Sequence, residues 1–273
     1  MRREIEIFRH NYQAWVPLPQ TLDDTHVHDV IIVGGGLYGL GLAWGLMRAK
    51  VTNILIVDRS PAGHEGPWST YARMKTLRTA KELSGIEFGI PSVSVRAYWE
   101  ARFGRAAWDE LERIPRVEFM QYLQWFRAVL ELPLSNETEA VSIGGHGNGK
   151  SNDDLARVTV LRNGQQQVLL ARRVVLATGL LGSGGPRLPA DLCVDLPAER
   201  WAHSTDDIDF DRWQRADVGV LGAGASAFDN AIRVAESGAA TVRQFCRRPE
   251  LPWLTAKIRF RERWIHAPFR RFF

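Results

Sequence analysis

Cysteine is scarce in this sequence of 273 residues, which contains only Cys193 and Cys246. The two lie far apart and form no Cys-x-x-Cys pair, the spacing typical of a dithiol redox centre or of half a zinc site. The composition therefore argues against a disulfide scaffold, a cysteine zinc site and a dithiol redox enzyme. No metal site is predicted.

Long apolar runs are also absent. No stretch approaches the ~20 apolar residues that span a bilayer. The charged segment 1–15 lacks the apolar core of a signal peptide. We expect a cytoplasmic protein with no membrane span. Its apolar fraction of 45% suffices for a buried core, and its length fits one large or two modest domains.

A strong charge of one sign is missing from most of the chain. The net charge is +4, but residues 257–273 carry six Lys or Arg and one Glu, which leaves −1 for the rest. The main body therefore gives no electrostatic reason to expect nucleic-acid binding. Residues 257–273 are predicted to form a basic tail, either without a role of its own or as an amphipathic helix at a membrane surface.

A strand–loop–helix–strand pattern begins near residue 29. The apolar, β-branched segment 29–33 predicts a buried parallel strand, and the glycines 34–36 follow it. Residues 37–50 have apolar side chains at helical spacing, and 53–58 predicts a second buried strand. This is a βαβ unit with parallel strands.

The first glycine loop has the spacing Gly34-x-Gly36-x-x-Gly39. In a dinucleotide-binding loop, the first glycine makes the tight turn, the second admits a pyrophosphate and the third lets the helix pack on the strand. Asp58 follows Gly39 by 19 residues, where an acid can bind a ribose hydroxyl. The pattern therefore predicts a dinucleotide site.

The chain beyond the second strand alternates irregular and regular segments. Residues 61–91 predict a long loop, of the kind that often covers a ligand, and 95–132 predict helices whose aromatic side chains fill the core. Residues 144–154 predict an exposed turn. Asn163-Gly164 predicts a tight hairpin turn that leads into the apolar run VVLATG.

The strand–loop–helix–strand pattern recurs near residue 217. Its loop is Gly222-x-Gly224-x-x-Ala227, and Ser226 offers a hydroxyl for phosphate contacts. Its second strand is followed by Arg247 and Arg248 instead of an acid. Because arginine pairs well with a ribose 2′-phosphate, we predict NADPH in preference to NADH. The alternative is a solvated basic turn.

These patterns predict an α/β fold with a Rossmann-like first domain and a second, incomplete Rossmann-like domain. The first domain is expected over 28–182, with the helical segment 95–132. The second is expected over 183–256, with the boundary at the Pro- and Gly-rich link GSGGPRLPADL, and the tail over 257–273.

The chain resembles the two-dinucleotide-binding flavoproteins, and within them the flavin-containing, Baeyer–Villiger and N-hydroxylating monooxygenases. The resemblance rests on VGGGLYGLGLAWGL, DRSPAGHEGPWST, VVLATG and LGAGASAFDNA followed by RR. It implies FAD at the first loop and NADPH at the second, with Trp68 near the flavin. The cofactor-binding residues implied are Gly34, Gly35, Gly36, Leu37, Tyr38, Gly39, Asp58, Arg59, Trp68, Ala177, Thr178, Gly179, Gly222, Gly224, Ser226, Ala227, Arg247 and Arg248.

The chain also departs from these monooxygenases. Arg78 stands where flavin-containing monooxygenases carry an asparagine, whereas Lys81 matches their lysine. The Baeyer–Villiger fingerprint is absent around His203, for which we expect a structural or linker role. Only 51 residues follow Gly222, so a truncated C-terminus is expected.

The resemblance implies an FAD-dependent NAD(P)H oxidoreductase, a monooxygenase acting on a small organic substrate. The alternatives are a flavin reductase without oxygen insertion and an inactive FAD/NAD(P)-binding fragment. No side chain stands out as an acid–base catalyst, which fits a protein that mainly binds and orients its cofactors. The sequence leaves the substrate and the oligomeric state open.

Overall fold

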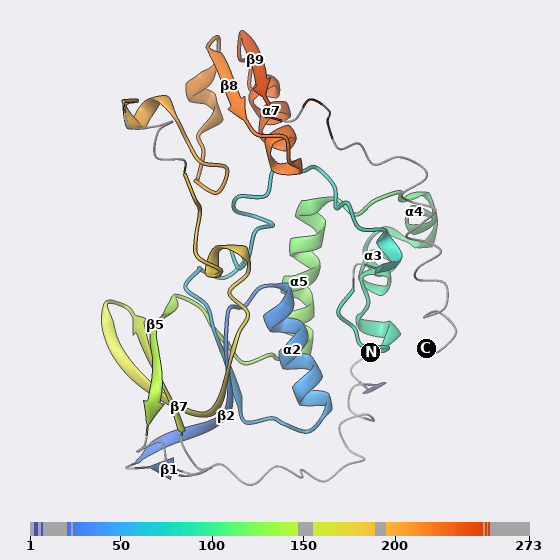
Figure 1. Cartoon of the computed structure of the whole chain (residues 1–273). Coiled ribbons are helices and arrows are strands. Elements are labelled where there is room, and N and C mark those ends of the chain that lie inside the picture. The colour runs from blue at the N-terminus through green and yellow to red at the C-terminus, as the bar shows by residue number, and fades with distance from the viewer. Residues whose placement is uncertain are drawn as a thin grey trace. The chain divides into compact units, whose positions relative to one another are not determined.

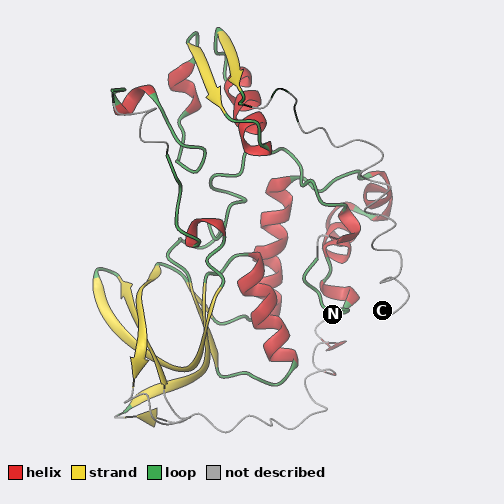
Figure 2. Ribbon diagram, in the orientation of Figure 1, coloured by secondary structure: helices red, strands yellow, loops and turns green. Residues whose placement is uncertain are grey.

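The computed structural model describes residues 3–4, 7, 21–22, 24–83, 85–146, 155–188, 195–247, 249 and 251. Contacts divide the chain into two compact units, residues 1–207 and 208–273. Figures 1 and 2 show their elements.

The first unit is built on a seven-stranded sheet. Its main path runs in the order β4-β3-β2-β7-β6-β5, and β1 pairs with β2. The strands are β1 (Thr21–Leu22), β2 (Thr25–Val33), β3 (Ile54–Val57), β4 (Leu134–Ser135), β5 (Thr138–His146), β6 (Leu155–Arg162) and β7 (Gln165–Leu176). The neighbours β4, β3, β2 and β7 are parallel, whereas β7, β6 and β5 form an antiparallel meander.

Strands β2 and β3 are covered on both faces, as their unbroken apolar runs predict. Successive side chains of a strand point to opposite faces. Ile32 and Ile56 accordingly belong to a core shared with the helices. Ile31 and Val57 belong to a second core, shared with Val158 of the meander and other buried side chains.

Helices cover one face of the parallel strands, and α2 and α5 lie side by side there (Figure 1). The helices are α2 (Leu37–Arg48), α3 (Val95–Phe103), α4 (Arg105–Glu110) and α5 (Arg116–Leu130). The short 3-10 turns η1 (Lys81–Leu83) and η2 (Pro91–Val93) precede α3, and η3 (Leu180–Gly182) and η4 (Ala198–Arg200) follow β7. Ser94 caps α3 by accepting a hydrogen bond from the Ala97 N–H at 3.1 Å.

The aromatic residues of 95–132 mostly fill the core, as predicted. Tyr122, Phe119 and Phe126 are fully buried there. The Tyr122 hydroxyl donates to the Val93 carbonyl at 3.0 Å, and burial raises the pKa of this phenol. Phe103 is the exception, because it remains 43% exposed.

The meander confirms one turn and corrects another. Asn163 and Gly164 have φ of 51° and 75°, as in the tight two-residue turn that was predicted between β6 and β7. The turn predicted over 144–154 was wrong at its start, because β5 continues through Gly144 and Gly145 to His146 and pairs with β6. Glycines suggest a turn in the sequence, but a neighbouring strand can hold them extended. Residues 147–154 lie outside the described ranges.

The second unit repeats the βαβ pattern on a smaller scale. β8 (Asp217–Leu221) and β9 (Thr241–Phe245) are parallel and in register, and α7 (Ala225–Glu236) connects them. The 3-10 turn η5 (Phe210–Trp213) precedes β8. The unit is therefore a minimal Rossmann-like element, as the second glycine loop predicted.

The contact-based division falls after Asp207, whereas the sequence placed the domain limit after residue 182. One reason is that Arg73 Nη2 donates to the Asp206 carbonyl at 2.9 Å, which ties the segment after η4 to the first unit. Within the described ranges, no helix combines the length and the apolar character that crossing a membrane requires.

Candidate functional site

Two glycines of the first loop are required by the fold itself. Gly34 has φ +112°, and a Cβ there would lie 2.4 Å from the Ala177 carbonyl oxygen of the neighbouring chain segment. A Cβ on Gly39 would lie 1.8 Å from the Gly34 carbonyl oxygen. These residues allow the tight turn and the close helix–strand approach that the spacing predicts.

Gly36 is different, because the protein itself leaves room for a side chain there. The nearest described atoms to a Cβ on Gly36 would be in Gly66, at 3.7 and 3.9 Å. Gly36 is the N-cap residue of α2. No side chain caps this end of the helix with a hydrogen bond, and the first turn contains no acidic residue. The N–H groups of that turn have no intrahelical acceptors. This open, positively polarised helix end fits a diphosphate.

Asp58 lies directly after β3 and beside the loop. Its Oδ2 accepts a hydrogen bond from the Gly35 N–H at 2.7 Å, and its Oδ1 accepts one from the Ser60 N–H at 2.8 Å. An ionised carboxylate has about four acceptor positions, so capacity remains for ribose hydroxyls. The next residue, Arg59, is exposed, and its charge opposes the rise in pKa that burial causes at Tyr71.

The returning strand reaches the same loop. After β7, the Ala177 N–H donates to the Val33 carbonyl at 2.8 Å. Thr178 and Gly179 are exposed, and Gly179 has φ +66°. The structure thus brings 177–179 next to Gly34, as expected for a segment that passes a cofactor.

Trp68 lies in the segment that follows Asp58 along the chain. Its ring packs edge-on against Phe119, with centroids 5.1 Å apart. Its buried Nε1 has no hydrogen-bond acceptor among the described residues. A buried donor without an acceptor is unusual in proteins, and a ligand group can supply one. Proximity of Trp68 to a flavin stays a prediction.

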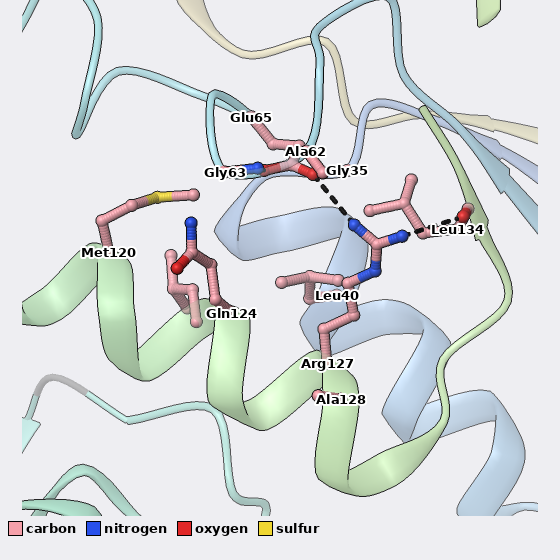
Figure 3. A pocket seen from close by; sticks show the side chains of 11 residues that line it. Gly35, Leu40, Ala62, Gly63, Glu65, Met120, Gln124, Arg127, Ala128 and Leu134 are labelled. Carbon is pink, nitrogen blue, oxygen red and sulfur yellow. Dashed lines mark hydrogen bonds and ion pairs between the residues drawn. The ribbon is translucent and has the colours of Figure 1, made fainter. Parts of the chain in front are cut away.

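A cavity of about 320 Å³ lies beside the glycine loop (Figure 3). Its wall is formed by the loop around Gly63, by α5 and by Leu134. Glu65 and Arg127 form an ion pair at its edge, with Nη1 and Oε1 3.1 Å apart. Neither residue was predicted from the sequence, because a pair 62 positions apart produces no local pattern. The only signal was a single acid in a glycine-rich loop.

A second cavity, of about 550 Å³, lies against η1 and α4, and Lys81 and Trp108 are among its lining residues. Lys81 Nζ donates to the Trp108 carbonyl at 2.6 Å and lies 4.9 Å from the centroid of its ring. None of the residues that line this cavity comes from the first glycine loop. After η4, His203 Nδ1 and Thr205 Oγ1 are 2.7 Å apart, a local turn contact.

The second unit has its own open helix end. Gly222 has φ +137°, and its N–H donates to the Phe245 carbonyl at 2.9 Å. Gly224 precedes α7 without a side-chain cap, and a Cβ there would meet no described atom within 4 Å. Ser226 is exposed in the first turn, and Ala227 permits close packing, since its Cβ lies 3.2 Å from a Cβ built on Gly222.

The two predicted arginines follow β9. Arg247 is exposed, as binding to a ribose 2′-phosphate would require. Arg248 lies outside the described residues.

Comparisons with known proteins agree with this geometry. A 42% identical relative, the FAD-dependent urate hydroxylase of Xanthomonas campestris pv. campestris, aligns over 252 residues, which are 92% of this chain and 52% of the relative. The chain thus spans about half the length of that curated relative.

Solved structures show the same fold. The reduced form of ornithine hydroxylase from Pseudomonas aeruginosa has a TM-score of 0.73 at 20% identity, covering 89% of this chain and 59% of its own. The FAD-bound cadaverine monooxygenase of desferrioxamine biosynthesis from Erwinia amylovora has a TM-score of 0.67 at 23% identity, covering 88% of this chain and 56% of its own.

The family described as FAD-NAD(P)-binding matches residues 31–181 of this chain. This range runs from β2 to η3 and includes the first glycine loop, Asp58 and the segment 177–179. The chain therefore belongs to the FAD-NAD(P)-binding family.

Proposed function

We propose that this chain is the nucleotide-binding part of an FAD-dependent NADPH oxidoreductase, a monooxygenase that acts on a small organic molecule. FAD binds at the first glycine loop and NADPH at the second. The observation that carries the proposal is the uncapped end of α2 behind Gly36, with Asp58 beside it. The reaction class is supported by the urate hydroxylase relative.

The residues of the first unit bind and orient the nucleotide. The N–H groups of the first turn of α2, including those of Leu37 and Tyr38, donate to the diphosphate. Asp58 accepts from the ribose while its contact with Gly35 holds the loop in shape. Bound FAD supplies the redox chemistry, accepting hydride from a nicotinamide and passing electrons onward.

The residues of the second unit bind the coenzyme in the same manner. Gly224 and Ser226 face its diphosphate at the start of α7, and Arg247 with Arg248 pairs with the 2′-phosphate of NADPH. An acid at that position would instead repel this phosphate. The arginines therefore favour NADPH over NADH.

Urate is the first substrate to test, because the curated relative hydroxylates it. The FAD-loaded chain is mixed with NADPH in air, with and without urate, and both NADPH oxidation and hydroxylated product are measured. Urate-dependent product formation is expected. NADPH oxidation that urate leaves unchanged, together with fast reduction of artificial acceptors, would favour a reductase without oxygen insertion.

A further inference from the structure

The loop 59–66 is fixed by a buried polar network. Glu65 is only 4% exposed, and its two carboxylate oxygens accept three hydrogen bonds. Oε1 accepts from Arg127 Nη1 at 3.1 Å and from Asn136 Nδ2 at 2.6 Å, and Oε2 accepts from the Gly63 N–H at 2.8 Å. We call Glu65, Arg127 and Asn136 the clamp.

The clamp joins three separate parts of the first unit. Arg127 comes from the last turn of α5, and its Nη2 also donates to the Leu134 carbonyl at 3.1 Å. Asn136 follows β4, and its Nδ2 also reaches the Ser60 carbonyl at 3.0 Å. The loop is thereby held at both ends, at Ser60 and at Glu65, while the Gly63 contact sets the turn between them.

Stability alone is a weak explanation for this arrangement. Removing the Glu65 carboxylate and most of the Arg127 side chain from water is costly, and apolar replacements of similar size often hold a fold equally well. Hydrogen bonds that join a buried carboxylate to two other chain segments instead specify one geometry. The clamp is therefore best explained by the position that it gives to the loop.

That position is next to the first glycine loop. Gly66 follows Glu65 directly, and a Cβ built on Gly66 would lie 3.7 Å from the Cα of Gly36. Gly36 is the residue whose open space fits the diphosphate. At the other end of the loop, Ser60 donates its N–H to Asp58, the predicted ribose ligand. Both predicted nucleotide contacts thus adjoin the loop that the clamp holds.

We propose that Glu65, Arg127 and Asn136 are positioning residues for FAD: they hold loop 59–66 so that Gly36 and Asp58 keep the spacing that the diphosphate and ribose require. The inference rests on the proposed function. It adds that FAD affinity depends on how firmly loop 59–66 is held. Part of this hold comes from Arg127 of α5, which lies far from the glycine loop in sequence.

The test removes both charges together, so that neither is left buried without its partner. The variant Glu65→Gln with Arg127→Met is compared with the unaltered chain for FAD affinity, measured by the quenching of flavin fluorescence. Apparent affinity falls in proportion to the fraction of molecules whose loop is in the binding geometry, and we expect FAD to bind at least tenfold more weakly. The control is Arg96→Met with Glu100→Gln, an Arg–Glu pair on α3 that is 2.7 Å apart, with side chains 51% and 30% exposed. It should leave the affinity unchanged.

A second readout needs no FAD. Arg59 is an exposed trypsin site in loop 59–66. Because the double variant holds this loop less firmly, trypsin should cleave it after Arg59 faster than the unaltered chain. Urea unfolding of both proteins shows whether the fold is intact. If the double variant does not fold, Asn136→Ala replaces it, because it breaks the link to Ser60 without changing charge; weaker FAD binding and faster cleavage are again expected.

The outcomes separate the two claims. An unaltered chain that binds no FAD contradicts the proposed function, and this inference with it. The positioning role alone is overturned by a different result. In that case the unaltered chain binds FAD, and the folded variant binds it with equal affinity and is cleaved equally fast after Arg59.

Discussion

At the scale of single residues, the glycines of the first loop serve different purposes. At Gly39 the protein has no space for a Cβ, since the Gly34 carbonyl oxygen would lie 1.8 Å away, whereas at Gly36 the nearest described atom would be 3.7 Å away. The residue spacing predicts these separate purposes, and the described atoms around each glycine agree with them. The separation permits a test of ligand binding that leaves folding aside.

Gly36→Ala should fold and lose FAD. The protein accommodates the added methyl group, but the diphosphate would meet it, so we expect FAD affinity to fall at least tenfold, about 1.4 kcal/mol. Gly39→Ala should instead lower the unfolding midpoint in urea without FAD present. Equal FAD affinity in Gly36→Ala and the unaltered chain would show that the nucleotide does not approach this residue.

The arginines after β9 should distinguish the two nicotinamide coenzymes. Charge-assisted hydrogen bonds contribute about 1.5–3 kcal/mol, so Arg247→Ala with Arg248→Ala should weaken NADPH tenfold or more and leave NADH nearly unchanged. Flavin reduction rates over a range of coenzyme concentrations measure both affinities. Arg243→Ala, an exposed arginine within β9, controls for loss of charge. A parallel loss for NADPH and NADH would contradict the 2′-phosphate assignment.

His28 should make the first unit sensitive to mild acid. Burial lowers the pKa of His28 below 6.5, the nearby His26 lowers it further, and Asp29 opposes both. Asp29 is itself paired with Arg172. Below pH 6.5 the unfolded chain binds a proton that folded His28 resists, so stability present above that pH is lost as the pH falls.

Urea unfolding at pH 7 and pH 5.5 tests this. The unaltered chain should lose stability between these values, and His28→Gln should lose less. An equal loss in both proteins would assign the acid sensitivity to other groups.

At the scale of elements, local patterns predicted most of what the structure contains. β2, α2, β3, the β6–β7 turn and the repeat β8–α7–β9 follow from apolar runs, helical spacing and turn residues. β5 was not predicted, because Gly144 and Gly145 suggest a turn and only pairing with β6 makes them a strand. Strand formation of this kind depends on a neighbour and cannot be read from the segment itself.

The β6–β7 turn provides an element-scale prediction. Gly164 has φ +75° with open space around it, so Gly164→Ala should cost about 1–2 kcal/mol of unfolding free energy from backbone strain alone. Gly144→Ala, in β5, also meets no described atom within 4 Å but has no positive φ, and should be nearly neutral. Urea unfolding of both variants measures the difference. Equal costs would contradict a left-handed requirement at Gly164.

At the scale of the whole molecule, the sequence predicted two nucleotide-binding units but not the contacts that shape the first site. The clamp joins Glu65, Arg127 and Asn136 from three elements, and such long-range pairing has no periodic signature. The Arg73–Asp206 contact, between residues 133 positions apart, likewise has no local signature. Assignment of FAD to the first unit and of NADPH to the second stays a proposal.

The most direct test of that proposal is the visible absorption spectrum of the purified chain after loading with FAD and desalting, taken before and after anaerobic NADPH. We predict a retained flavin spectrum that NADPH bleaches, because each glycine loop presents an uncapped helix end to a nucleotide. A colourless chain that retains no FAD would contradict the proposed function of its first glycine loop.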